Sequence, residues 1–226
     1  MKIIRQGSFE TNSSSTHALV IPHKVKDYNY SLSDSLDNNY CYGRDESRLV
    51  EYWDEKLAYI YVIIKELSSY NWSENQIKIT KDMVKSFKER INKIYEEVYN
   101  IVEYKPHNSL KPNDIFDYVD GIKEVERNVI MLDTFYGSPY VDHVGRFSDE
   151  DMKPFLEKIF NDDDFLKRFI FNKEGYITIG GDEYRGYNIK TIGFEYDYGD
   201  AYDDDNEFWE KLEEYKKNND VFLKGN

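Results

Sequence analysis

The side chains best suited to chemistry lie near the start of the chain, where a carboxylate, an amide, several hydroxyls and a histidine follow one another. Residues 10–17 read Glu10-Thr11-Asn12-Ser13-Ser14-Ser15-Thr16-His17, and an apolar run begins at residue 18. Hydroxyl, amide and backbone N–H groups crowded into one turn can bind a polar or anionic ligand. We therefore expect a ligand site formed by Arg5, Glu10, Asn12, Ser13, Ser14, Ser15 and Thr16. The alternative is a loop whose hydroxyls bond only to its own backbone.

Two histidines could add proton transfer to such a site, because imidazole changes charge near neutral pH. His17 ends the hydroxyl-rich segment, and His143 directly follows Asp142. If the protein is an enzyme, we expect His17, His143 and Asp142 to be its catalytic residues. A triad with Ser14 is disfavoured, because no nucleophile elbow is present. The spacing matches no known zinc motif, so we predict neither a metal nor a cofactor, and the residues leave open whether any reaction is catalysed.

A second candidate surface is acidic and lies toward the C-terminus. Carboxylates dominate residues 195–214, and tyrosines are interleaved with them. The side chains that we expect to contact a partner are Asp200, Asp203, Asp204, Asp205, Tyr196, Tyr198 and Tyr202. Carboxylates among aromatic rings could imitate a nucleic-acid backbone and occupy a basic site on another protein. The alternative is a solvated loop followed by a helix whose first turn favours acidic residues.

The overall charge limits the kinds of partner. The 226 residues include 30 basic and 44 acidic side chains, which gives a formal net charge of −14. Because binding to phosphates needs a basic face, this balance excludes a general nucleic-acid-binding protein. It favours a partner with a basic surface, although acidity can also serve solubility alone. One basic patch is predicted, on a helix that carries Lys78, Lys81, Lys85, Lys88, Arg90 and Lys93, and it fits either a solvated face or a phosphate-bearing partner.

Cysteine content and hydropathy indicate the compartment. The one cysteine, Cys41, excludes a disulfide framework and a cysteine-based zinc site. No apolar run typical of a signal peptide follows Lys2 and Arg5, and the apolar stretch at residues 58–64 is too short to span a bilayer. We therefore expect a cytoplasmic protein without membrane contact, whose oligomeric state the sequence leaves open.

Two long helices are expected in the middle of the chain. The apolar residues of the first are Leu49, Trp53, Leu57, Ile60, Ile64 and Leu67, and those of the second are Met83, Phe87, Ile91, Ile94, Val98 and Ile101. Both series recur every three or four residues, which places each series on one helix face. Thr80 is a suitable N-cap for the second helix. Matching stripes and a short connection predict an antiparallel helical hairpin within residues 48–104.

Shorter elements complete the prediction. We expect strands at residues 2–5, 18–21, 129–132, 175–180, 189–196 and 221–223, and helices at 114–128, after Ser148, after Asp162 and at 207–216. Residues 23–47 lack a clear period and are interpreted as a long loop. The pattern predicts a single α+β domain over residues 1–226, with a small mixed or antiparallel sheet, the long antiparallel helical hairpin and further short helices.

The first residues also resemble a known group of sequences. The run from Arg5 to His17, with its Phe-Glu-Thr-Asn-Ser-Ser-Ser-Thr-His core, is similar to the start of a group of proteins of no established activity from bacteriophages and low-GC bacteria. The resemblance covers only this opening segment and implies a phage or mobile-element setting. With the charge, it favours a protein that acts by binding, as an acidic inhibitor of a host or defence protein. The alternative is an enzyme, or a protein that binds a nucleotide or phosphate ligand, using residues 12–17.

Overall fold

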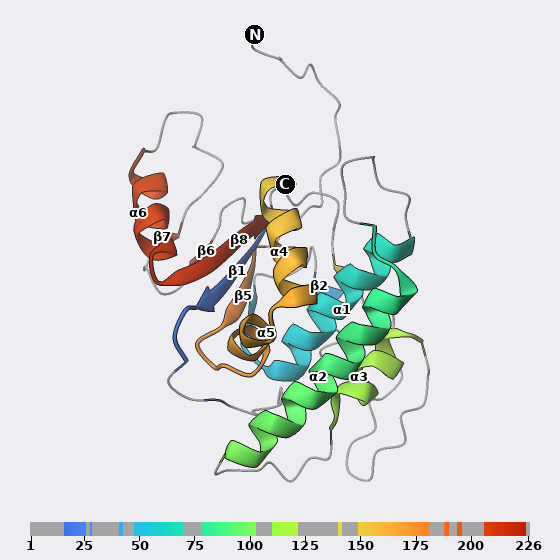
Figure 1. The fold of residues 1–226 in the computed structure, drawn as a ribbon. Helices are drawn as coiled ribbons and strands as arrows, with labels where there is room; N and C mark the ends of the chain where they lie inside the picture. The colour runs from blue at the N-terminus through green and yellow to red at the C-terminus, as the bar shows by residue number, and fades with distance from the viewer. Residues whose placement is uncertain are drawn as a thin grey trace.

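The fold was analysed in a computed structural model. It describes residues 16–25, 28, 41–42, 48–69, 78–102, 110–121, 140–141, 149–180, 188–189, 194–195 and 206–224. Helices and an antiparallel sheet share this part of the chain, which confirms the predicted α+β class. Figure 1 shows the sheet on one side, the two long helices on the other, and the helices of residues 149–161 and 163–170 between them.

The main sheet has four strands in the order β3-β5-β1-β8, and each neighbouring pair is antiparallel. The strands are β1 (Thr16–Pro22), β3 (Arg48–Val50), β5 (Tyr176–Gly180) and β8 (Asn219–Lys224). Leu19 in β1 lies opposite Ile177 of β5 and Phe222 of β8. The strands predicted at residues 18–21, 175–180 and 221–223 are therefore confirmed, and they pair with one another although they are far apart in sequence.

Two small ladders accompany the main sheet. Strand β2 (Cys41–Tyr42) pairs in parallel with β4 (Tyr140–Val141), and β6 (Asn188–Ile189) pairs antiparallel with β7 (Phe194–Glu195). The single strand expected at 189–196 is thus wrong, because its two ends belong to separate strands that pair antiparallel with each other. The strands expected at 2–5 and 129–132 lie outside the described residues.

The long helices are α1 (Trp53–Ser69) and α2 (Lys81–Ile101), and they run antiparallel. The ring of Trp53 lies 5.6 Å from that of Tyr95, while Lys88 lies over the ring of Tyr61, 4.8 Å from its centroid. Contacts of the start of α1 with the end of α2, and of the middle with the middle, confirm the predicted hairpin. Its predicted first residues are wrong: Leu49 is in β3, where it pairs with Thr178, and the first helix begins only at Trp53.

Burial differs between these two helices. On α2 the predicted stripe is confirmed at Phe87, Ile91, Ile94 and Val98, whereas Ile101 at the helix end is 65% exposed. On α1, by contrast, every residue from Trp53 to Ile64 is buried, so a single apolar face describes it poorly. The reason is its position, because α1 contacts α3, α5 and β4 on different sides.

Four shorter helices complete the described part of the chain: α3 (Pro112–Val119), α4 (Asp149–Asn161), α5 (Asp163–Ile170) and α6 (Asn206–Lys216). Helix α3 begins two residues before its predicted start, because Pro112 suits the first helical position. Its predicted end at residue 128 is wrong, since the helix ends at Val119 and Gly121 has a φ of 84°. Helix α5 begins after Asp162 as predicted, and Asp162 is its N-cap, since its Oδ1 accepts a hydrogen bond from the Phe165 amide at 2.8 Å. Thr80 caps α2 in the same way through the Met83 amide.

The two faces of the sheet are covered differently. Leu19, Ile21, Ile177 and Phe222 face the large core that contains α1 to α5. The alternate residues Ala18, Val20 and Val221 face a smaller core that contains Leu212 of α6. This alternation follows from the period of two residues along a strand. Figure 1 shows α6 on the side of the sheet away from α1 and α2.

Candidate functional site

The candidate site is built on the start of β1, where His17 enters the sheet. Because His17 alternates with Ala18, its side chain faces the large core, as those of Leu19 and Ile21 do. Its side chain is 0% exposed. The imidazole that the sequence singled out for proton transfer is therefore part of the interior.

Tyr59 of α1 holds this imidazole. The Tyr59 hydroxyl lies 2.8 Å from Nδ1 of His17, and the two rings are tilted by 47° with their centroids 5.6 Å apart. Burial raises the pKa of Tyr59 well above its usual value, so the phenol keeps its proton at neutral pH. One of the two groups donates to the other according to the tautomer of His17.

Tyr42 connects the pair of His17 and Tyr59 to the parallel ladder of β2 and β4. Its ring stands at 89° to that of Tyr59, with 5.0 Å between centroids, and its hydroxyl donates to the main-chain carbonyl of Glu55 at 2.6 Å. Tyr42 also pairs with Val141 in β4. In the sequence Val141 directly precedes Asp142 and His143, so the strand that leads to the second predicted histidine packs beside this aromatic pair. We call His17, Tyr59 and Tyr42 the β1 aromatic cluster.

Three consecutive charged residues lie buried at the start of α1, beside the β1 aromatic cluster. Asp54, Glu55 and Lys56 are 3%, 2% and 1% exposed. A buried charge is costly unless it has partners, so such a run is unusual. Nζ of Lys56 donates to the carbonyls of Asn172 and Gly175 at 2.7 and 2.8 Å. Burial lowers the pKa of Lys56 to about 7, although Glu51, Asp54 and Glu55 act in the opposite direction.

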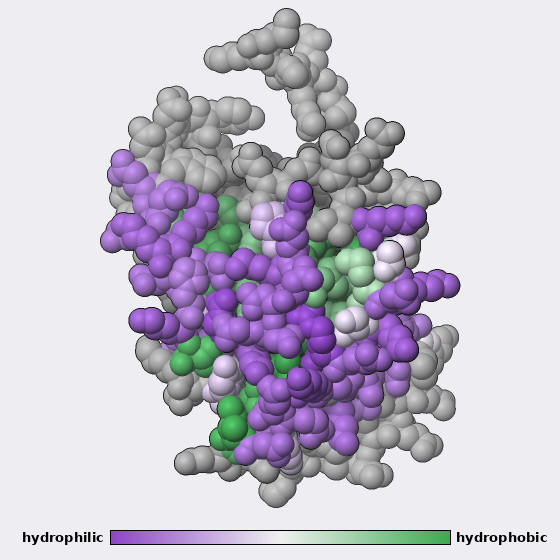
Figure 2. Space-filling view, viewed as in Figure 1, coloured by the Kyte–Doolittle hydropathy of each residue, from purple (hydrophilic) through white to green (hydrophobic). Residues whose placement is uncertain are grey.

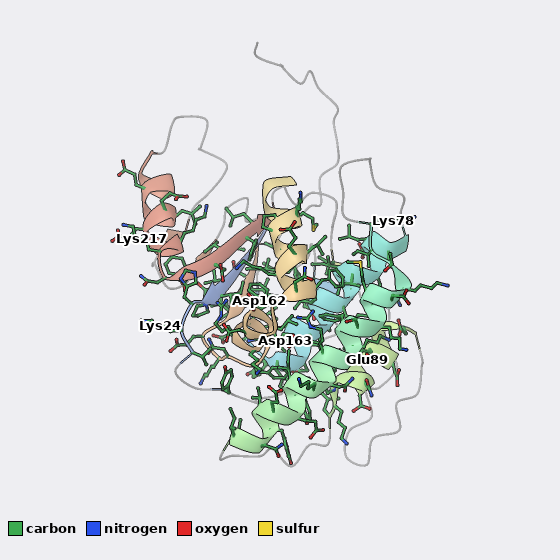
Figure 3. The ribbon with its side chains drawn as sticks, viewed as in Figure 1. Lys24, Lys78, Glu89, Asp162, Asp163 and Lys217 are labelled. Atoms are coloured by element: carbon green, nitrogen blue, oxygen red, sulfur yellow. The ribbon has the colours of Figure 1, made fainter. Side chains whose placement is uncertain are left out.

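The basic side chains predicted to form a patch on α2 fall into two groups, those that pair with other elements and those that pair along the helix itself. Lys88 turns toward Asp120 at the end of α3, and Arg90 turns toward Asp163 at the start of α5. Figure 3 shows Asp163 on the side of α5 that faces α2. The more exposed lysines have weaker pairs along the helix, with Lys85 to Glu89 and Lys93 to Glu97 both at 3.9 Å. This arrangement fits a solvated face whose inner cations hold helices together.

Asp120 is the centre of a second polar cluster on the same side. It accepts the Tyr61 hydroxyl at 2.9 Å and Nζ of Lys88 at 2.9 Å, while Nζ of Lys65 lies 3.2 Å away. Burial opposes ionisation of Asp120, but the hydrogen bonds from Lys88, Tyr61 and Lys65 lower its pKa. The cluster joins α1, α2 and α3 through one carboxylate that contacts two lysines and a tyrosine, which indicates a structural role.

Most residues predicted for the ligand site lie outside the described part of the chain. These are Arg5, Glu10, Asn12, Ser13, Ser14 and Ser15, together with Asp142 and His143 of the enzyme alternative. For Thr16 the structure gives the backbone, which pairs with Gly180 of β5. The acidic and aromatic partner residues Tyr196, Tyr198, Asp200, Tyr202, Asp203, Asp204 and Asp205 also lie outside it. The ligand site and the partner surface therefore stay predictions.

Sequence reasoning missed three contributors to the interior beside His17, namely Tyr42, Lys56 and Tyr59. Lys56 had a visible signal, because Asp54-Glu55-Lys56 interrupts the apolar series of a helix that otherwise reads as core. Tyr59 had none, because only the pairing of β1 with its neighbours places residue 17 against α1. Within the described residues, no group of three or more His, Cys, Asp and Glu side chains could hold a metal ion.

Comparison of the chain with known protein families, curated protein sequences and solved structures finds no match in any of the three. In the described part of the chain, none of the helices has both the length and the apolarity needed to cross a membrane. The case for a function therefore depends on charge, sequence and the geometry given above.

Proposed function

We propose that this protein acts by binding a protein partner that has a basic surface, as an acidic inhibitor of a host or defence protein in a phage or mobile-element setting. The net charge of −14 supports a basic partner. The setting is supported by the resemblance of residues 5–17, and cellular proteins that recognise nucleic acid offer basic sites of the required kind.

The observation that carries the proposal is the orientation of α6. Its Leu212 is fully buried against the second face of the sheet, while Glu210, Glu213 and Glu214 are exposed. Helix α6 begins directly after Asp203, Asp204 and Asp205 in the sequence. The helix that ends the acidic segment thus turns its carboxylates to solvent, where a partner could meet them.

Affinity capture from a bacterial lysate tests the proposal. The baits are the wild type and a variant with the charge reversals Glu210→Lys and Glu214→Lys, two residues without an ion pair among the side chains that the structure describes. The matched control carries Glu96→Lys and Glu157→Lys, exposed residues of α2 and α4 that change the net charge equally. We expect the wild type and the control to capture the same basic protein, and the α6 variant to lose it. Equal capture by the wild type and both variants would refute a role for α6.

A second candidate function is the binding of a polar or anionic ligand by residues 12–17. The position of His17 favours this function. The contact with Tyr59 fixes the end of the hydroxyl-rich segment, and a ligand site with one fixed end loses less conformational entropy when the ligand binds. Thermal shift with inorganic phosphate and nucleotides tests it, with Ser14→Ala and Ser15→Ala as the variant. A stabilisation by phosphate that this variant abolishes would support the ligand site, and no shift in the wild type would remove it.

A further inference from the structure

Lys56 is a buried lysine whose side chain forms hydrogen bonds with the main chain of a segment that is distant in the sequence. Its Nζ donates to the carbonyls of Asn172 and Gly175, at 2.7 and 2.8 Å. Both carbonyls belong to residues 171–175, which we call the α5–β5 corner because they connect those two elements. Lys56 therefore ties the start of α1 to the point from which β5 begins.

The α5–β5 corner is closely packed. A Cβ atom at Gly175 would lie 2.9 Å from the Arg168 carbonyl oxygen and 3.0 Å from that of Phe169, so only glycine allows this approach. Asn172 is 1% exposed, and its Oδ1 accepts the Glu174 amide at 3.0 Å. If the corner opened, the carbonyls of Asn172 and Gly175 would exchange their bonds with Lys56 for bonds with water.

The protonation state of Lys56 differs between a closed and an open corner. Burial disfavours an ammonium, and a neutral amine still has two N–H groups for the two carbonyls. The carboxylates that act on Lys56 are those of Glu51, Asp54 and Glu55. On the side of the α5–β5 corner, Lys173 and Glu174 belong to the corner itself and Tyr28 pairs with Asn172. Arg168 of α5 is held by Asp164 and Asp220. The three carboxylates favour the ammonium but do not cancel the effect of burial.

We propose that Lys56 and the α5–β5 corner form a proton-linked latch, which opens more readily as the pH falls toward neutrality. Opening transfers Lys56 to water, where a lysine binds a proton up to a pKa of about 10.4. In the closed state the pKa of Lys56 is about 7. Between pH 7 and about pH 10.4 the open state therefore binds a proton that the closed state does not, so lowering the pH in this interval favours opening. The α5–β5 corner leads directly into β5, whose last residue pairs with Thr16.

Native-state hydrogen exchange of peptides that cover residues 168–180 tests the latch in the full chain. After correction for the chemical exchange rate, we expect the opening equilibrium of the α5–β5 corner to rise roughly 50-fold from pH 9 to pH 7, and to change little below pH 7. The variant Lys56→Met should lose this dependence. Lys93→Met, which alters a lysine whose side chain is 74% exposed, should keep it.

An opening equilibrium that is independent of pH in the wild type would overturn the proposal, as would an unchanged dependence in Lys56→Met. If Lys56→Met does not fold, the ¹³Cε resonances of the wild-type lysines decide the matter. One lysine resonance that titrates near neutral pH, and that Lys56→Arg removes, would support the latch. A set of lysine resonances that all titrate near pH 10 would contradict it.

Discussion

The hydroxyl of Tyr59 connects the histidine that the sequence marked for chemistry to the interior of the fold. It lies 2.8 Å from Nδ1 of His17, and both side chains are completely buried. In such a place a lost hydrogen bond leaves a polar atom unsatisfied, which costs more than the bond itself contributes. His17 therefore serves first to fix the start of β1, and any role toward a ligand would use that fixed position.

Replacing Tyr59 with phenylalanine removes only this hydroxyl. We expect Tyr59→Phe to lower the free energy of unfolding by about 1–2 kcal/mol, because the ring packing against Tyr42 persists while Nδ1 of His17 loses its contact. Denaturant unfolding measures the change. Tyr215→Phe, at a partly buried hydroxyl 3.2 Å from that of Tyr176, is the control and should cost less than about half as much. Equal losses in the two variants would show that the contact with His17 has no special weight.

The buried tyrosines also set an alkaline limit to stability. Burial raises the pKa of Tyr95 to about 12 and that of Tyr59 above its usual value. The unfolded chain loses these protons near pH 10, so folding stability that is present below pH 10 is lost as the pH rises through the folded-state values. We expect the free energy of unfolding to fall by about 2 kcal/mol between pH 10 and pH 12 for Tyr95 alone. Tyr95→Phe should remove that part of the decline in pH-dependent denaturation; an unchanged slope would contradict it.

At the scale of elements, cations of the long helices satisfy carbonyls at or just beyond the ends of the short ones. Arg90 donates through Nη1 to the carbonyls of Ile159 and Phe160 in the last turn of α4. Lys65 donates in the same way to the carbonyl of Val119, the last residue of α3. The last carbonyls of a helix lack internal partners and carry partial negative charge, so a cation there is doubly favourable. This explains why the hairpin organises the helices around it.

Arg90 tests this explanation against a neighbour on the same helix. We expect Arg90→Met to reduce the free energy of unfolding by about 2–3 kcal/mol, because it removes the hydrogen bonds to the partly buried carbonyls of Ile159 and Phe160 and the ion pair with Asp163. Lys93→Met should change it by less than about 0.5 kcal/mol, since its pair with Glu97 is long and exposed. Thermal or denaturant unfolding of both variants measures the difference. If the two losses were the same, the cation at the end of α4 would not stabilise the fold.

The sequence predicted these elements well where periodicity and caps determine them. The stripe of α2, with Thr80 before it, predicts that helix and most of its buried face, although Met83 is only half-buried and Ile101 is exposed. Leu49 was assigned to a helix because its spacing fits the α1 stripe, whereas its pairing with Thr178 makes it part of β3. Pairing with a strand far away in the sequence determines the secondary structure of Leu49, and local spacing cannot reveal such a partner. The same holds for Tyr59 and Lys56, whose roles depend on segments that are remote in the chain.

At the scale of the whole molecule, charge is distributed unevenly between inside and outside. Cations such as Lys65, Lys88 and Arg90 turn inward to carbonyls and carboxylates of α3, α4 and α5 and of the residue after α3. Figure 2 shows that the face over α2, α4 and α5 is largely hydrophilic. Helix α6 on the opposite side of the sheet exposes carboxylates. Because these basic side chains are engaged inside the fold, the net charge of the exposed side chains is more negative than it would be if they faced solvent.

The measurement that tests the proposed function most directly is the salt dependence of binding by the purified partner obtained in affinity capture. If the acidic exterior carries the interaction, we expect the affinity to fall at least about tenfold between roughly 0.05 M and 0.3 M NaCl, because salt screens the opposed charges. The Glu210→Lys and Glu214→Lys variant should bind weakly at both concentrations, while the Glu96→Lys and Glu157→Lys control follows the wild type. An affinity that neither salt nor the α6 reversals change would contradict the account.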